Sequence, residues 1–329
     1  MAGGGGRPGG RPPPPRPPAA VASRHGRRAA SRKASHLVTS QQFFQYIFSG
    51  ITSGSIYALT ALGFTLVYNA TGIINFAQGE LVMLGGLSAI GLYRSGLPLP
   101  AAFVGALIIV LIVAVLFEQL AIRPLMAKGV LAQVIATVGA SLALRTAAMM
   151  IWGREALPLP PFSGDDPIRI LGASLTPQTL WVVGTMIFIV LTLQFFYKRT
   201  LTGKAVRACA VNPLAARLMG VSYASVVLLS FAVSGVISAA GGAMIAPISF
   251  MSYSSGALLG LKGFAAATLG GLGNPLAAVF GGLALGILEG LAVGLVSSGY
   301  KDAIAFVILL LVLFVRPQGA FGGRVVERE

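Results

Sequence analysis

The sequence predicts an all-α fold, a polytopic membrane protein of about 8-9 transmembrane helices with glycine-broken segments in each half. Hydrophobic residues make up 55% of the 329 residues and charged residues only 10%. The mean hydropathy of +0.83 is far above the usual value for a soluble domain. Apolar runs long enough to cross a roughly 30 Å hydrocarbon layer recur after residue 42, and in lipid they must be helical to satisfy their own backbone.

The expected helices follow these apolar runs in order. Their approximate ranges are 43–67, 73–93, 98–121, 129–152, 177–197, 222–246, 257–272, 275–296 and 302–316. Glycine clusters interrupt 73–93 and 257–272, and a re-entrant geometry for either one would make the number of crossings even.

The loops predict the orientation of the chain. Loops 122–128 and 198–221 carry Lys and Arg but no acid, which places them in the cytoplasm together with the basic C-terminal segment. Loop 153–176 carries three acids and suits the opposite side. An odd number of crossings then puts the N-terminus outside, against the strongly basic character of residues 1–36. We follow the internal loops, because they agree with one another.

Three regions are expected along the chain. Residues 1–36 are rich in Gly, Pro and Arg without apolar periodicity, so we expect a disordered tail that cannot bury enough surface to fold. Residues 37–323 hold the membrane domain, and 324–329 form a cytoplasmic C-terminal tail. The first long apolar run continues into a full span, unlike a signal peptide, and a wrongly assigned start codon is an alternative origin for the tail.

Composition argues against several classes of function. The chain has one cysteine, Cys209, and its two histidines, His25 and His36, lie in the tail, so neither a disulfide framework nor a metal site is expected. The net charge of +15 comes largely from the tail and from residues flanking apolar runs, so we expect no nucleic-acid partner. Paired carboxylates and nucleophile motifs are missing from the sequence, which predicts no catalytic residues and no enzyme activity.

Small residues recur four positions apart in three of the expected helices, and such ladders let helix backbones approach closely. Packing within one subunit is favoured over a dedicated subunit interface. The ladders are Gly50, Gly54 and Ala58; Ser230, Ser234, Ser238 and Gly242; and Ala278, Gly282, Gly286, Gly290 and Gly294.

The ionisable residues expected within the bilayer are Glu80, Glu118, Arg145, Lys262 and Glu289. A charge at the bilayer centre costs at least about 2.5 kcal/mol, so each should face the protein interior, a cavity or the headgroups. Glu118 and Lys262 lie near helix ends, from which their side chains can snorkel. For the deeper Arg145 and Glu289, a structural interhelical pair is favoured over contact with a solute.

Two segments, 71–86 and 256–275, each combine a glycine cluster with a single charge. Broken helices in corresponding positions of two halves point to a solute path, because irregular backbone in a membrane must be packed or line a cavity. A pair of structural kinks explains the spacing equally well, and Asn75 could simply cap the following helix. The candidate path residues are Asn75, Gln78, Gly79, Glu80, Gly85, Gly86, Lys262, Gly270 and Gly271.

Three segments carry recognisable motifs: "GITSGSIYALTALGFTLVYNATGIINFAQGELVMLGG" (50–86), "TGKAVRACAVNPLAARLMGVS" (202–222) and "GLKGFAAATLGGLGNPLAAVFGGLALGILE" (260–289). In this order, they resemble the first permease signature, the cytoplasmic coupling loop and the second-half block of the permease subunits of branched-chain amino acid (Liv-type) ABC transporters. The likeness extends from about residue 42 to 323. Gln78 stands where many members have His, and Gly263 where many have Ala.

The resemblance implies that 37–323 is an ABC importer permease domain in the cytoplasmic (inner) membrane, carrying branched-chain or related apolar amino acids. The implied partners are the lipid bilayer, a second homologous permease, two ATP-binding subunits and an extracytoplasmic substrate-binding protein. ATP would be bound by those partners, because Gly203-Lys204 lacks the rest of a phosphate-binding loop, so no cofactor is expected in this chain. The alternatives are the same importer class for urea or short amides, and an ion-coupled secondary transporter.

The 202–222 loop is expected to receive the ATP-binding subunits. Asn212 and Pro213 should start a short amphipathic helix that presents Leu214 and Leu218 and ends at Gly220. The alternative is an ordinary basic loop that only fixes topology. The residues assigned to coupling are Lys204, Arg207, Asn212, Pro213, Ala215, Ala216, Arg217 and Gly220.

Overall fold

The structure is a computed structural model of the chain, and it describes residues 1–4, 40–164, 166–170, 173–295, 298–315 and 319. The chain divides into two units, Met1–Thr39 and Ser40–Glu329, and every element below belongs to the second. The expected tails lie outside the described residues, except for residues 1–4, which are exposed.

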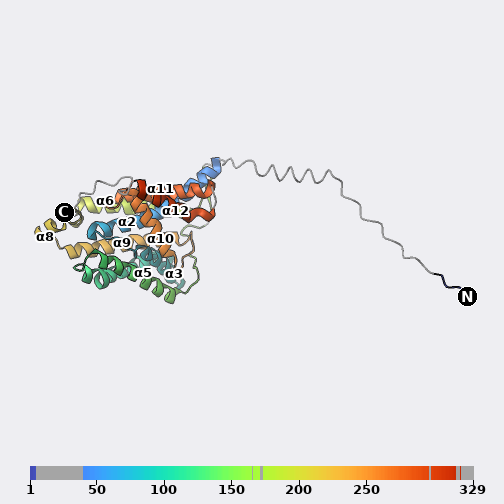
Figure 1. Cartoon of the computed structure of the whole chain (residues 1–329), viewed down its shortest axis with the longest axis horizontal. Coiled ribbons are helices and arrows are strands. Elements are labelled where there is room, and N and C mark those ends of the chain that lie inside the picture. The colour runs from blue at the N-terminus through green and yellow to red at the C-terminus, as the bar shows by residue number, and fades with distance from the viewer. Residues whose placement is uncertain (5–39, 165, 171–172, 296–297, 316–318, 320–329) are drawn as a thin grey trace. The chain divides into compact units, whose positions relative to one another are not determined.

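The second unit is a bundle of α-helices (Figure 1). They are α2 (Ser40–Thr71), α3 (Gln78–Arg94), α4 (Leu99–Phe117), α5 (Val130–Trp152), α6 (Pro177–Arg199), α7 (Leu201–Val211), α8 (Pro213–Leu218), α9 (Tyr223–Ile245), α10 (Ser255–Gly270), α11 (Pro275–Leu295) and α12 (Lys301–Val315). Each apolar run expected to be helical coincides with one of these helices, so the all-α membrane fold is confirmed.

Six of the described helical segments are long and apolar enough to cross a membrane. They are Gln41–Thr71, Leu99–Leu125, Val130–Trp152, Pro177–Arg199, Tyr223–Ile245 and Pro275–Gly294. Helices α3, α10 and α12 are shorter, with 17, 16 and 15 residues. The number of crossings expected from the sequence therefore stays a prediction for these three helices.

The sequence did not reveal a small hairpin in the loop between α5 and α6. Strand β1 (Ile168–Ile170) pairs antiparallel with β2 (Ala173–Leu175), with Ile168 opposite Leu175. The Gln45 side chain at the start of α2 donates to the Ser174 carbonyl at 3.0 Å and accepts from the Ser174 N–H at 2.8 Å. These two bonds fix the hairpin to α2.

Helices α2 and α11 pack antiparallel along two of the small-residue ladders. A Cβ on Gly50 would lie 2.8 Å from the carbonyl oxygen of Gly286, and one on Gly54 would lie 3.0 Å from that of Gly282. Real Cβ atoms essentially never come as close to a backbone as 2.8 Å and rarely as close as 3.0 Å, so glycine is needed for the contact at Gly50 and favoured at Gly54. The expected packing of the ladders within one subunit is confirmed for this helix pair.

Burial separates central from peripheral helices. In the most apolar stretch of each helix, 89% of the residues of α2 and 72% of those of α9 are buried, against 22% for α4, 11% for α5 and 22% for α6. The peripheral helices expose large apolar side chains such as Ile108, Leu142 and Phe188. In lipid an exposed apolar surface carries no hydrophobic cost, so this distribution fits a membrane environment.

Replacing Gly286 with Leu should destabilise the bundle by about 1–3 kcal/mol or more, because the added side chain must force α2 and α11 apart. Thermal unfolding in detergent measures the effect. Gly184→Leu in α6 is the matched control, because a Cβ at Gly184 meets nothing within 4 Å. Equal melting temperatures for the two variants would show that the α2–α11 contact contributes nothing to stability.

Candidate functional site

Helix α2 gives way to α3 through a short non-helical segment, 72–77, inside the bundle. The N–H of Ala77 donates to Asn75 Oδ1 at 3.0 Å, and the N–H of Phe76 donates to Thr137 Oγ1 of α5 at 3.2 Å. These side chains replace the helical partners that the backbone has lost, as a membrane interior requires. Asn75 thus forms a turn ahead of α3 and is not its N-cap, which is Ala77.

Gln78 is fully buried, and its hydrogen bonds link α3 to the segment 72–77 and to α9. Its Oε1 accepts from Asn75 Nδ2 at 3.3 Å and from Ser234 Oγ at 2.9 Å, and its Nε2 donates to Ser238 Oγ. Gly63 of α2 makes room for the amide, because a Cβ there would overlap Gln78 Nε2. The glutamine therefore holds α3 against α2 and α9.

Glu80 forms an ion pair across the bundle with Arg145 of α5. Arg145 Nη2 lies 2.8 Å from Glu80 Oε1, and Ser141 Oγ donates to the same oxygen at 3.1 Å. The Glu80 side chain is 1% exposed, whereas the Arg145 side chain is 31% exposed. Arg145 is thus the member of the pair that reaches open space.

A cavity of about 350 Å³ lies beside this ion pair, between α2, α3, α5 and α10. Among the described residues that line the cavity, Glu80 and Arg145 carry a charge. The apolar and small residues around them include Phe64, Val138, Leu142, Gly256, Gly260, Leu261 and Phe264. We call this cavity, with its ion pair, the α3–α10 cleft.

Glycines bring α3 and α10 together at the edge of the cleft. A Cβ on Gly260 would lie 3.0 Å from the Cα of Gly79, and one on Gly256 would overlap Glu80 Oε2. These glycines therefore fix both the spacing of the helices and the room around the Glu80 carboxylate.

The remaining glycines proposed for the path make helix contacts in this structure. Gly85 lies against the backbone of Ala239 in α9, and a Cβ on Gly86 would lie 3.0 Å from the carbonyl oxygen of Gly242. Gly270 packs against the Ala277 carbonyl of α11, and Gly271 ends α10 with a φ of 119°. Their contribution to a solute path stays a prediction.

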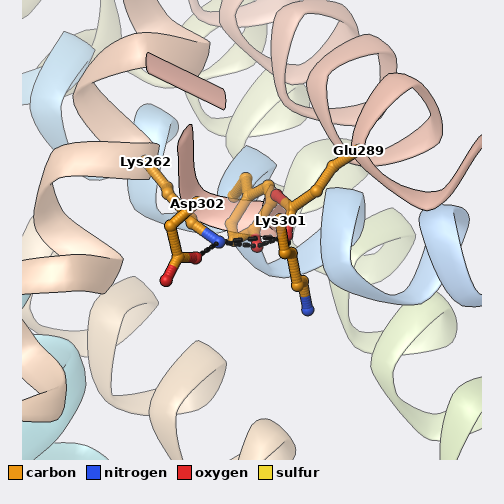
Figure 2. Close-up of polar contacts among 5 residues, drawn as sticks. Lys262, Glu289, Lys301 and Asp302 are labelled. Atoms are coloured by element: carbon orange, nitrogen blue, oxygen red, sulfur yellow. Dashed lines mark hydrogen bonds and ion pairs between the residues drawn. The ribbon is translucent and has the colours of Figure 1, made fainter. Parts of the chain in front are cut away.

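A second group of charges lies where α2, α10, α11 and α12 meet, and Figure 2 shows Asp302 and Glu289 reaching the ammonium group of Lys262. Lys262 Nζ lies 2.7 Å from Asp302 Oδ1 and 3.0 Å from Glu289 Oε1, and it donates to the Tyr57 hydroxyl at 3.2 Å. Lys301 Nζ lies 3.4 Å from the same Glu289 oxygen. Two cations and two carboxylates thus balance their charges in this cluster.

These contacts correct three expectations. Arg145 and Glu289 each belong to an interhelical pair, but they are not partners of one another, because Glu80 and Lys262 lie closer. Lys262 does not snorkel, since it is buried and the buried Glu289 carboxylate meets its ammonium group. Glu118 is also buried, in a π-helical turn (Glu118–Ile122), and neither of its carboxylate oxygens has a hydrogen-bond partner among the described residues.

The expected short helix in the 202–222 loop is present as α8. Asn212 Oδ1 accepts from the N–H groups of Leu214 and Ala215, both at 3.0 Å, and Gly220 follows the helix with a φ of 85°. Leu214 is 73% and Leu218 87% exposed. The helix therefore presents apolar side chains with no described neighbour to cover them.

Other residues of this loop divide between packing and exposure. Ala216 is buried against the end of the bundle, so an acid at this position would disturb folding as well as any docking. The Arg217 guanidinium lies over the ring of Tyr223, 4.5 Å from its centroid. Lys204 and Arg207 are exposed on α7, a helix that the sequence reading treated as loop. Thr200 is the local sequence signal for the start of α7. Its hydroxyl accepts a hydrogen bond from the Gly203 N–H at 2.9 Å and caps the helix.

Within the described ranges, no three His, Cys, Asp or Glu side chains gather as they would around a metal ion.

A helical membrane bundle with an open cleft beside a buried ion pair is an architecture suited to a solute permease. Residues 46–313 match the family described as the permease component of branched-chain amino acid transport systems. The chain therefore belongs to the branched-chain amino acid (Liv-type) ABC transporter permease family. It is a multi-pass membrane permease and not an enzyme, as the sequence predicted.

Two relatives illustrate the similarity. The high-affinity branched-chain amino acid transport system permease protein LivH of Salmonella typhimurium is 34% identical over 302 residues, covering 87% of this chain and 97% of the relative. The corresponding protein BraD of Pseudomonas aeruginosa is 34% identical over 306 residues, covering 87% and 98%. Among solved structures, PsaBC from Streptococcus pneumoniae in complex with Fab is similar over 89% of this chain and 97% of the PsaBC chain. The TM-score is 0.45 and the sequence identity 14%, so this likeness carries no argument.

Replacing Gln78 with Met should destabilise the protein by about 1–3 kcal/mol, because Asn75 and Ser238 lose a hydrogen-bond partner in a buried site. The exposed Gln119→Met is the control and should change stability little. Thermal unfolding in detergent measures both. A melting temperature of Gln78→Met equal to that of the control would contradict the role of Gln78 as a helix link.

The Cys209 thiol should react slowly with maleimides. Burial raises the pKa of this thiol, with a smaller opposing effect of Arg217, so less thiolate is present at neutral pH and labelling should accelerate only at higher pH. In the purified chain we expect labelling roughly tenfold or more slower than for Met219→Cys, an exposed position, in a Cys209→Ser background. Equal rates would show that α7 does not bury Cys209 against the bundle.

Proposed function

We propose that this chain is a membrane-spanning permease subunit of an ATP-binding cassette importer that translocates branched-chain or related apolar amino acids across the cytoplasmic membrane. The observation that carries the proposal is the 34% identity, over nearly the whole of each relative, to proteins named for high-affinity branched-chain amino acid transport. The α3–α10 cleft supports it, because its apolar walls and single ion pair suit a small solute with a charged end and an apolar end.

The solute path is proposed to run past the α3–α10 cleft. Glu80 borders it directly, and Gly79 meets α10 at its edge. The other residues assigned to the path are proposed to hold the helices that shape it. They are Asn75, Gln78, Gly85, Gly86, Lys262, Gly270 and Gly271.

We further propose that α3, α10 and α12 complete a set of about 8–9 crossings, with the extra length supplied by their flanking segments. The antiparallel contact of α2 with α11 supports an arrangement in which the N-terminus of α2 and the C-terminus of α11 face the same side. With an odd number of crossings and a cytoplasmic C-terminus, that side is the outside of the membrane.

Energy is proposed to reach the permease through α7 and α8. Two separate ATP-binding subunits would dock on the 202–222 loop and bind the ATP, a second homologous permease would complete the pore, and an extracytoplasmic binding protein would deliver the solute. The exposed apolar side chains of α8 support docking, because a short helix with an apolar face fits a groove on a partner.

Reconstitution tests the proposed cargo. The chain is combined in proteoliposomes with the second permease, the ATP-binding subunits and the binding protein, and ATP-dependent uptake of labelled leucine is measured with and without excess urea. Uptake of leucine that urea does not inhibit supports the proposal. Uptake of urea alone would favour the short-amide alternative, and uptake driven by an ion gradient without ATP would favour a secondary transporter.

Leu218→Asp should prevent docking of the ATP-binding subunits, because the change places a charge at the centre of the proposed contact. A central apolar contact contributes about 2 kcal/mol, or roughly thirtyfold in affinity. Co-purification of the subunits with the tagged permease measures it. Leu97→Asp, at an exposed position in the loop between α3 and α4, is the control and should bind normally. Unchanged co-purification by Leu218→Asp would exclude α8 as the docking helix.

A further inference from the structure

The ion pair of the α3–α10 cleft leaves hydrogen-bonding capacity unused on both of its members. Glu80 Oε1 accepts hydrogen bonds from both Arg145 and Ser141. Glu80 Oε2 and Arg145 Nε have no hydrogen-bond partner among the described residues. Buried polar atoms without partners are rare because each costs free energy. This pair is therefore satisfied only in part, next to an open cavity.

The surroundings of the pair leave room for a small ligand at this point. The cavity of about 350 Å³ is at the lower end of the range of roughly 300–1,000 Å³ for ligand pockets. Gly256 lies directly against the Glu80 carboxylate and covers Oε2, so a ligand reaches this carboxylate only when the ion pair rearranges. Phe64, Leu142 and Phe264 provide apolar walls around the charged end.

We propose that Glu80 and Arg145 bind the α-amino acid zwitterion by exchanging partners with it, the solute carboxylate pairing with Arg145 and the solute ammonium with Glu80. This inference rests on the proposed transport of amino acids and adds the site at which their common charged part is recognised.

Charge balance explains why a zwitterion fits and a singly charged solute does not. Without a solute the two protein charges neutralise each other, and when a zwitterion inserts, each charge has a new partner of opposite sign. A simple carboxylic acid would take Arg145 and leave the buried Glu80 unpaired, which is strongly unfavourable, and a simple amine would take Glu80 and leave Arg145 without its partner. Arg145, 31% exposed, is the member that a solute meets first.

Uptake by the reconstituted transporter tests the role of the pair. Arg145→Gln combined with Glu80→Gln keeps polar side chains of similar size but removes both charges. We expect leucine uptake to fall at least tenfold, while co-purification of the ATP-binding subunits stays unchanged and shows that the complex still assembles. Arg145→Lys should recover part of the uptake, and Arg154→Gln, an exposed residue outside the cleft, should behave as the unsubstituted protein.

Direct binding to the full chain in nanodiscs separates recognition from stability. Saturation-transfer NMR is recorded with leucine, with 3-methylbutylamine, which lacks the carboxylate, and with 4-methylpentanoate, which lacks the ammonium group. We expect a signal from leucine at least tenfold stronger than from either analogue, and its loss in the doubly substituted chain. Equal signals from the three compounds, or no signal from leucine, would overturn the proposal.

The outcomes distinguish this inference from the proposed function. If the unsubstituted transporter takes up leucine and the doubly substituted one does so equally well, the zwitterion site is wrong and the transport function stands. If the unsubstituted transporter takes up no amino acid at all, the proposed function itself fails.

Discussion

The bundle depends on helix backbones that touch without side chains between them. Helix α3 is held this way on two sides, by Gly79 against α10 and by Gly85 against α9. In a membrane the hydrophobic effect does not draw helices together, so close packing of this kind supplies much of the attraction. The position of α3 in turn sets where Gln78 and Glu80 lie, because both belong to its first turn.

The two ion-pair groups solve the same physical problem in different ways. Lys262 is surrounded by two carboxylates and a phenol, so its charge is compensated in every direction that the described residues show. The Glu80–Arg145 pair has one short contact and unpaired atoms beside a cavity. In the Lys262 cluster one buried atom, Glu289 Oε2, lacks a partner among the described residues, whereas the Glu80–Arg145 pair has an unpartnered atom on each member and can exchange partners at a lower cost.

Much of the fold could be predicted from the sequence, because each long helix is marked by a continuous apolar run. The cap of α8 was also predictable, since Asn212-Pro213 is a local signal. The pairing of Arg145 with Glu80 was not, because 65 residues separate them and only the packing of α5 against α3 brings them together. Helix α7 and the β1–β2 hairpin were missed because their short, mixed segments look like loops.

The Lys262 cluster has a consequence for the biogenesis of the protein. Its members lie on α2, α10, α11 and α12, so the chain is synthesised in an order that exposes Lys262 before either carboxylate has emerged. Glu289 follows 27 residues later and Asp302 only at the start of α12. The insertion machinery must therefore hold α10 next to a polar surface until α11 and α12 arrive. We expect α10, α11 and α12 to leave the insertion machinery as one group.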